Sequence, residues 1–235
     1  MIPLRDINPT RTFPLVTIMI IVANVLAFLY ELTLSPAALT RFIADYGTVP
    51  YQITHNVALD PAFTLPVYLT LITAQFLHGG WLHIAGNMLY FWIFGNNIED
   101  RFGHFRFLVI YLFWGVAAGL TQVLIAPDSR VPELGASGAI AGVLGAYLVL
   151  FPTARVVTLI PLGFFLTTLR LPAVFVIGEW IVLQFLNGFV VVGGAPVDSG
   201  VAYFAHIGGA VIGVLTGLLY RIASPRRNYN TLEGM

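Results

Sequence analysis

One serine stands among small residues in the stretch PELGASGAIAGVLGAY, which runs from Pro132 to Tyr147. A serine hydroxyl becomes a nucleophile when a neighbouring base accepts its proton, and histidine is the usual base near neutral pH. Ser137 is therefore a candidate nucleophile, and His206, in the apolar stretch VAYFAHIGGAVIGVLTG, is a candidate base. That stretch holds no Asp or Glu, so the two residues predict a Ser–His dyad rather than a triad.

A nucleophilic serine also needs donors that stabilise the oxyanion formed in the reaction. His83 and Asn87 are four residues apart in FLHGGWLHIAGNMLYFWIFG, so on a helix they lie on one face, one turn from each other. The backbone N–H of Ser137 would lie at a helix start, where such groups have no partner within the helix. We therefore expect His83, Asn87 and the Ser137 N–H to supply the oxyanion donors.

These residues occur in a strongly apolar chain of 235 residues, of which 58% are hydrophobic and 9% charged, with a mean hydropathy of +0.86. A soluble domain has about 25% charged residues, so the composition is that of a membrane protein. With roughly 20 residues per spanning helix, the chain predicts an all-α, polytopic bundle of six transmembrane helices. The predicted spans are 14–34, 81–96, 105–126, 137–151, 172–192 and 201–221.

Two apolar stretches are too short or too broken to span a membrane. The stretch 156–169 contains Pro161 and Gly163, and the stretch 62–77 contains Pro66. Stretches of this kind favour interfacial or re-entrant segments.

The basic residues predict the orientation of the six spans. All eleven are arginines, and nine fall on one side and two, Arg41 and Arg130, on the other. This bias places both termini in the cytoplasm. We expect a cytoplasmic N-terminal segment at 1–13, a six-span domain at 14–222 and a short, polar, loosely ordered cytoplasmic tail at 223–235.

In this topology the second, fourth and sixth spans run in the same direction, so their first residues share one depth. At about 1.5 Å per residue, His206 lies about 8 Å below that end, and Asn87 lies at a similar depth. A lone Ser often bonds to its own backbone and an Asn often joins two helices, but four polar residues at one depth favour a site. Small residues on the fourth and sixth spans would let these helices approach closely and bring Ser137 within reach of His206. These small residues are Gly138, Ala141, Gly142 and Gly145, and Gly209, Gly213 and Gly217.

At these positions the sequence resembles the rhomboid family of intramembrane serine proteases. GASGAIAG resembles the family's GxSG nucleophile motif, HGGWLHIAGN its His-x-x-x-Asn motif with an earlier histidine, His78, and AHIGGAVIG its sixth-span histidine. EDRFG, with Glu99, Arg101 and Gly103, matches a further pattern between the second and third spans.

The resemblance implies an intramembrane serine endopeptidase without a cofactor or metal, acting on single-span membrane proteins in the lipid bilayer. It implies that Ser137 is the nucleophile and His206 the general base, and that His83, Asn87 and the Ser137 N–H form the oxyanion hole. Supporting roles fall to His78, Gly135 and Gly138. The resemblance also implies that the fifth span and the loop after it gate lateral entry of the substrate, and Trp180 and Phe185 are candidate gate residues.

Other functions remain open at this point. A non-catalytic rhomboid-like protein would hold membrane clients, although such relatives lack the serine or the histidine, and a small transporter would need a polar site at the midplane. His78 and His83 are five residues apart and the chain has no HExxH motif and no cysteine, which argues against zinc. The zero net charge gives no indication of nucleic acid. The absence of lysine and the compact core favour a bacterial inner membrane, and the role of Glu179, an intramembrane carboxyl, is open.

Overall fold

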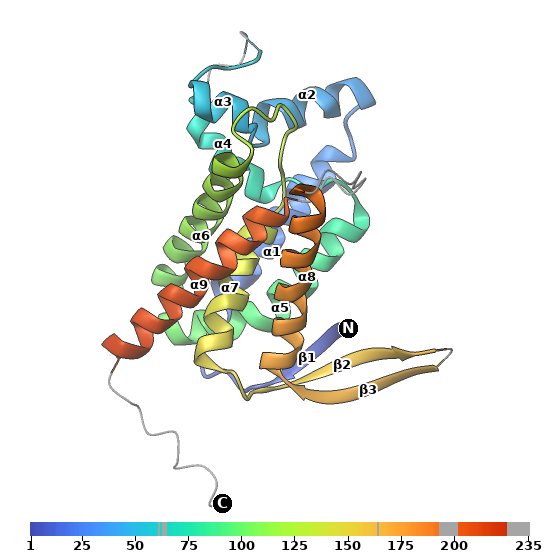
Figure 1. The fold of residues 1–235 in the computed structure, drawn as a ribbon, viewed down its shortest axis with the longest axis vertical. Helices are drawn as coiled ribbons and strands as arrows, with labels where there is room; N and C mark the ends of the chain where they lie inside the picture. Colours follow the sequence, from blue (N-terminus) through green and yellow to red (C-terminus); the bar gives the residue numbers. More distant parts are fainter. Residues whose placement is uncertain (61, 63–64, 164, 193–201, 225–235) are drawn as a thin grey trace, which may run out of the picture.

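The computed structural model describes residues 1–60, 62, 65–163, 165–192 and 202–224, and long helices packed side by side dominate it (Figure 1). The long helices are α1 (Leu15–Glu31), α5 (Trp81–Phe102), α6 (His104–Ile125), α7 (Ser137–Leu150), α8 (Ala173–Val192) and α9 (Tyr203–Ala223). Shorter elements close one end of the bundle: α2 (Pro36–Tyr46), α3 (Pro50–His55), η1 (Val67–Leu69), α4 (Thr70–Thr73) and η2 (Ala74–Phe76). The stretch 62–77 thus contributes helical turns 67–76 between α3 and α5.

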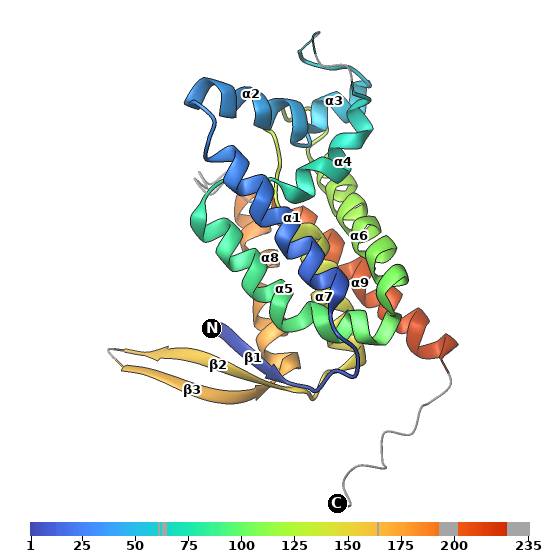
Figure 2. The same ribbon diagram turned by 180° about the vertical axis from the view of Figure 1, so that it is seen from behind.

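Helix α7 is the centre of the bundle. It contacts α5, α6, α8 and α9, and every residue from Gly138 to Tyr147 is buried. The view from behind shows α1 and α5 in front of it (Figure 2). Because α7 begins at Ser137, the candidate nucleophile lies at the end of the bundle that α2, α3 and α4 close.

Small residues let the backbones of α7 and α9 touch. A Cβ atom on Gly209 would lie 2.1 Å from the carbonyl oxygen of Gly138, and one on Gly213 would lie 2.0 Å from that of Gly142. A Cβ atom on Gly145 would lie 2.2 Å from the carbonyl oxygen of Ala210. The close approach predicted for these two helices is confirmed.

The start of α1 is fixed by a buried carboxylate from α5. Glu99 has no exposed surface and accepts hydrogen bonds from the backbone N–H groups of Val16 and Thr17, at 2.8 Å each. The imidazole of His104, at the start of α6, contacts the same carboxylate at 2.5 Å. Glu99 thereby satisfies orphan N–H groups of one helix and ties together three.

A three-stranded antiparallel sheet corrects the all-α prediction. Strand β1 (Ile2–Ile7) pairs with β2 (Arg155–Leu162), which pairs with β3 (Phe165–Pro172), in the order β1-β2-β3. The expected interfacial or re-entrant segment 156–169 is therefore a hairpin, and the N-terminal segment supplies its third strand. The physical reason is a run of β-branched residues in β2, which favour strands, followed by Gly163 at φ +60°, a conformation that glycine adopts without strain.

The helices are apolar enough to place the chain in a membrane. The segments His104–Ile125, Ala173–Val190 and Tyr203–Ala223 have the length and hydropathy to cross a bilayer, whereas α1 and α7 are apolar but have 17 and 14 residues. The predicted spans match these helix boundaries to within a few residues, except that α5 continues to Phe102. The chain is an integral membrane protein.

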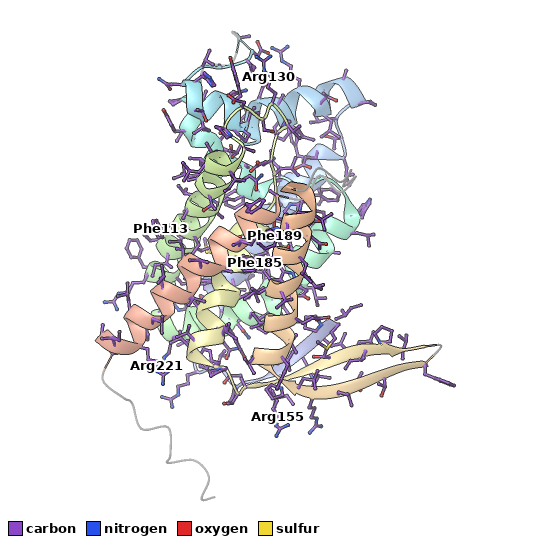
Figure 3. All side chains as sticks on the ribbon, in the orientation of Figure 1. Phe113, Arg130, Arg155, Phe185, Phe189 and Arg221 are labelled. Carbon is purple, nitrogen blue, oxygen red and sulfur yellow. The ribbon has the colours of Figure 1, made fainter. Side chains whose placement is uncertain are left out.

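Some aromatic side chains lie on the outside of the bundle and arginines lie at its two ends. Phe113 on α6 and Phe185 and Phe189 on α8 project from the bundle, and Arg130 lies at the end opposite Arg155 and Arg221 (Figure 3). Most of the predicted tail, 225–235, and the connection 193–201 lie outside the described residues.

Candidate functional site

The candidate nucleophile and base are in direct contact. Ser137, the first residue of α7, and His206, in the first turn of α9, place Oγ and Nε2 2.7 Å apart. The His206 side chain is buried. This contact depends on the close packing of α7 and α9, because Gly209 and Gly138, one turn or less from the dyad, leave no side chain between the two backbones.

The other nitrogen of His206 is held by a residue that the sequence analysis missed. Gln184 on α8 places Oε1 2.7 Å from Nδ1 of His206. An amide oxygen only accepts hydrogen bonds, so Nδ1 carries the ring proton and the lone pair of Nε2 faces Ser137. The indole of Trp180, one turn earlier on α8, lies 5.5 Å from the imidazole, centroid to centroid. The ring of His206 is therefore fixed by hydrogen bond and by packing.

A small space separates Ser137 from His83, and a glycine keeps it open. Gly135 has φ +126°, and a Cβ atom there would lie 2.8 Å from Nε2 of His83 and 3.5 Å from Oγ of Ser137. The backbone N–H of Gly79 donates to Nδ1 of His83 at 3.3 Å. The neutral ring of His83 then carries its proton on Nε2, which points toward the space beside Oγ. A hydrogen-bond donor therefore faces the position where an oxyanion would form.

Asn87 and His78 lie behind this space. Nδ2 of Asn87 donates to Nε2 of His78 at 3.0 Å, which uses one of the two hydrogens of the amide. The rings of His78 and His83 meet edge to face with centroids 5.1 Å apart. His78 is held in turn by Glu31, whose carboxylate accepts from its backbone N–H at 3.2 Å. The hydrogen bond between His78 and Asn87 therefore orients the Asn87 amide.

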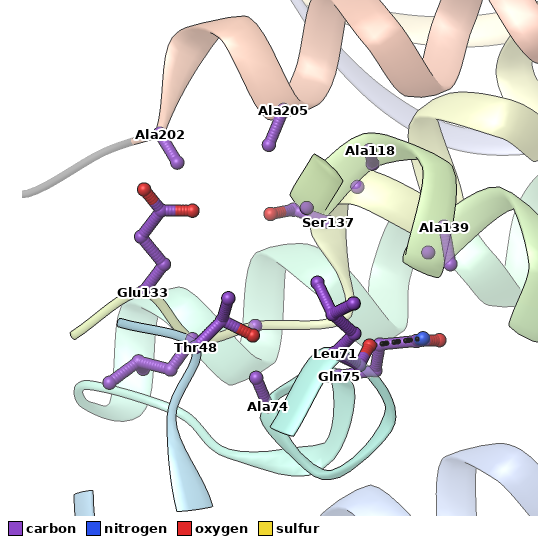
Figure 4. Close-up of a pocket in the computed structure, with 15 residues that line it drawn as sticks. Thr48, Leu71, Ala74, Gln75, Ala118, Glu133, Ser137, Ala139, Ala202 and Ala205 are labelled. Carbon is purple, nitrogen blue, oxygen red and sulfur yellow. Dashed lines mark hydrogen bonds between the residues drawn. The ribbon is translucent and has the colours of Figure 1, made fainter. Parts of the chain in front are cut away.

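A pocket opens directly on Ser137 (Figure 4). Its volume is about 40 Å³, more than the roughly 10–15 Å³ that one water molecule requires. Gly138 belongs to its wall, where a Cβ atom would lie 2.7 Å from that of Ala118. The pocket walls come from α4, α6, α7, α9 and the loop before Ser137.

The other residues singled out in the sequence lie away from the dyad. Glu179 accepts a hydrogen bond from the amino group of Met1 at 3.2 Å, near the sheet rather than near His206. Phe185 lines an apolar groove between α8 and α9 together with Ile207. In the described part of the chain, no group of three or more His, Asp or Glu side chains could hold a metal ion. The loop after α8, expected to take part in gating, lies outside the described residues.

Sequence comparisons relate the chain to named proteins. A Rhomboid domain model matches residues 66–223. Rhomboid-like protein 11, chloroplastic, of Arabidopsis thaliana is 29% identical over 177 residues, which cover 74% of this chain and 59% of that protein. Rhomboid protein 1, mitochondrial, of Saccharomyces cerevisiae is 29% identical over 169 residues, covering 70% of this chain and 45% of that protein. Rhomboid protease GluP of Bacillus subtilis is 42% identical over 78 residues, which cover 33% of this chain and 15% of that protein.

The chain thus spans about half the length of the first two relatives. The matched domain covers more than half of the chain and includes α5 to α9, with Ser137, His206, His83 and Asn87. On this match, the chain belongs to the rhomboid family.

Proposed function

We propose that the chain is an intramembrane serine endopeptidase that hydrolyses peptide bonds in or near transmembrane segments. The observation that carries this proposal is the 2.7 Å contact between Oγ of Ser137 and Nε2 of His206, with the other ring nitrogen bound to Gln184. The similarity to a relative named as a protease adds support.

The geometry supports acyl transfer through a dyad. Nε2 of His206 accepts the hydroxyl proton as Oγ of Ser137 attacks the scissile carbonyl, and the imidazolium is stabilised by the Gln184 oxygen. The Nε2–H of His83, the Ser137 N–H and the remaining amide hydrogen of Asn87 would stabilise the oxyanion. His206 then donates the proton to the leaving amine, and a water molecule hydrolyses the acyl-enzyme with His206 again as base.

The substrates we propose are single-span membrane proteins. Extended backbone has no hydrogen-bond partners in lipid, so a substrate helix must unwind where polar groups and water are available. The pocket at Ser137 offers such a place at one end of the bundle. His78, Gly135 and Gly138 support it by orienting Asn87 and by leaving room, as described above.

The proposed membrane arrangement uses α1, α5, α6, α7, α8 and α9 as six spans of a domain at 14–222. Both termini would be cytoplasmic, because Arg155 and Arg221 lie at the end of the bundle opposite Arg130 and arginines favour the cytoplasmic side. The names of two relatives refer to chloroplasts and mitochondria, and the comparisons do not support the expected bacterial inner membrane.

The test is cleavage of a single-span substrate by the reconstituted protein and its variants. We expect Ser137→Ala and His206→Ala each to lower cleavage by roughly 1,000-fold or more, while Ser129→Ala, in the same loop region, cleaves like the wild type. Labelling of the wild type by a fluorophosphonate should be lost in Ser137→Ala. Equal cleavage by wild type and Ser137→Ala would contradict the proposal. If the folded wild type neither cleaves the substrate nor is labelled, the result would favour a non-catalytic protein that binds membrane clients.

A further inference from the structure

The pocket beside Ser137 contains a carboxyl group that the reaction described above does not use. Glu133 lies four residues before the nucleophile, and its backbone is fixed by two hydrogen bonds to Thr48, N–H to carbonyl in each direction, at 2.8 and 2.9 Å. Thr48 is fixed in turn by its hydroxyl, which donates to the carbonyl of Thr70 at 2.9 Å. With its backbone held, the Glu133 side chain points into the pocket that the Ser137 hydroxyl also faces (Figure 4).

Most residues around this carboxyl group are small and apolar. Within the described residues, no hydrogen bond or ion pair joins its oxygens to another side chain. The nearby Arg130 lies over the ring of Tyr51, 4.4 Å from its centroid. Besides Glu133, the polar side chains among the described residues that line the pocket are those of Thr48, Gln75 and Ser137. The other pocket residues include Leu71, Ala74, Gly115, Ala118, Gly119, Ala202 and Ala205.

Burial alone raises the pKa of Glu133 to about 8. The Glu133 carboxyl is only partly exposed, and a carboxyl group that is partly withdrawn from water without a partner is stabilised when a donor reaches it. Both the neutral and the ionised form accept hydrogen bonds. Among the described residues, the donor groups that line the pocket are engaged elsewhere. The Thr48 hydroxyl donates to the carbonyl of Thr70, and Nε2 of Gln75 donates to the carbonyl of Leu71. The Ser137 hydroxyl contacts His206. The pocket volume of about 40 Å³ leaves room for a small group only. A substrate residue whose carbonyl is bound to Ser137 places its side chain beside that nucleophile.

We propose that Glu133 determines the specificity of this pocket by accepting a hydrogen bond from a small substrate side chain that carries a hydroxyl or amino donor. The inference rests on the proposed protease function. Glu133 binds the substrate and takes no part in bond cleavage. This role of Glu133 predicts that serine is preferred over alanine at the substrate residue that supplies the scissile carbonyl.

The experiment compares two single-span substrates that differ only in Ser or Ala at that residue. The readout is the ratio of their kcat/KM values on one preparation, which cancels any loss of folded protein. For the wild type we expect a ratio of about 10, because a hydrogen bond to a charged or desolvated acceptor contributes that much. Glu133→Leu should bring the ratio to about one or below, and Glu133→Gln, which keeps an acceptor oxygen, should retain a clear preference for serine.

The matched control is Asp128→Leu, which removes an exposed carboxylate of the same loop that does not line the pocket. It should keep the wild-type ratio. A ratio near one for the wild type, or an unchanged ratio in Glu133→Leu, overturns the role of Glu133. In both cases, cleavage that is lost in Ser137→Ala leaves the protease function standing. If no Ser137-dependent cleavage of either substrate occurs, the function and this inference fail together.

Discussion

His206 is held on three sides by residues from two neighbouring helices. Ser137 of α7 contacts Nε2, Gln184 of α8 contacts Nδ1, and Trp180 of α8 packs against the ring. In a Ser–His–Asp triad the third residue holds the tautomer of the histidine and stabilises the imidazolium. Gln184 holds the same nitrogen with a neutral amide, which fixes the tautomer without adding a negative charge.

Replacing this amide should weaken the base without changing substrate binding. We expect Gln184→Leu to lower kcat by roughly 10- to 100-fold, the usual effect of losing a partner that orients a functional histidine, with KM little changed. Gln184→Glu, which retains an acceptor oxygen, should restore most of the activity. Steady-state kinetics on the reconstituted protein measure both constants. A higher KM with an unchanged kcat would show that Gln184 acts on substrate binding.

The residues of the dyad could be predicted because their chemistry and depth are visible in the sequence. Ser137 begins a helix of small residues and His206 lies one turn inside another. Gln184 could not be assigned in the same way, because an amide in an apolar helix commonly joins two helices and no spacing links it to a residue 22 positions away. The signal that could have found it is its position in IVLQFLNGF, at a depth near that of His206.

At the scale of elements, the dyad depends on the packing of α7 against α9. The geometry leaves no room for a methyl group between Gly213 and the carbonyl oxygen of Gly142, and two other glycines of this pair meet carbonyl oxygens at similar distances. Larger residues would push the helices apart and separate Ser137 from His206.

Gly213→Ala should therefore lower the free energy of unfolding by about 1–3 kcal/mol, the usual cost of overpacking, and reduce cleavage as well. The matched control is Gly86→Ala on α5, where a Cβ atom meets nothing within 4 Å. Alanine there should stabilise the helix by about 0.5–1 kcal/mol. Thermal unfolding in detergent measures both. Equal effects of the two substitutions would contradict the assigned packing.

The helices were easier to predict than the sheet. Long apolar runs mark α6, α8 and α9, and their boundaries follow from where those runs stop. The hairpin was misjudged because Pro161 and Gly163 made 156–169 resemble a broken helix, although its Val, Thr and Ile residues favour a strand. Its partner β1 lies about 150 residues earlier, and no local pattern shows a pairing over that distance.

At the scale of the whole molecule, Asp6 connects the sheet to the bundle. Its carboxylate accepts hydrogen bonds from Nδ2 of Asn97 on α5, at 2.7 Å, and from the hydroxyl of Tyr147 on α7, at 3.0 Å. Burial, the larger effect, raises its pKa to about 6, against the lowering effect of these hydrogen bonds. The folded state therefore holds this proton more tightly than the unfolded chain, in which the pKa is 3.8.

The stability contribution of Asp6 should be complete below pH 4 and decline as the pH rises through 6. We expect the Tm of the wild type to fall between pH 4 and pH 7, and Asp6→Asn to make this fall smaller. Part of the fall remains, because burial also raises the pKa of Glu133. Asp128→Asn, which alters an exposed carboxylate, should leave the profile unchanged. Differential scanning measurements in detergent across this range are the check. A slope that is as steep in Asp6→Asn as in the wild type would assign the proton to another group.

The pairing of β1 with β2 also sets an order on biosynthesis. Pro3 lies opposite Thr158, so the first strand leaves the ribosome long before its partner exists. At roughly 5–20 residues per second, it waits on the order of 10–30 s while α1, α5, α6 and α7 are made and inserted. During that time its backbone N–H and C=O groups have no sheet to join. β1 can pair only after α1, α5, α6 and α7 have been made, so ribosome-bound chains that end before residue 155 should carry an N-terminal segment open to proteases.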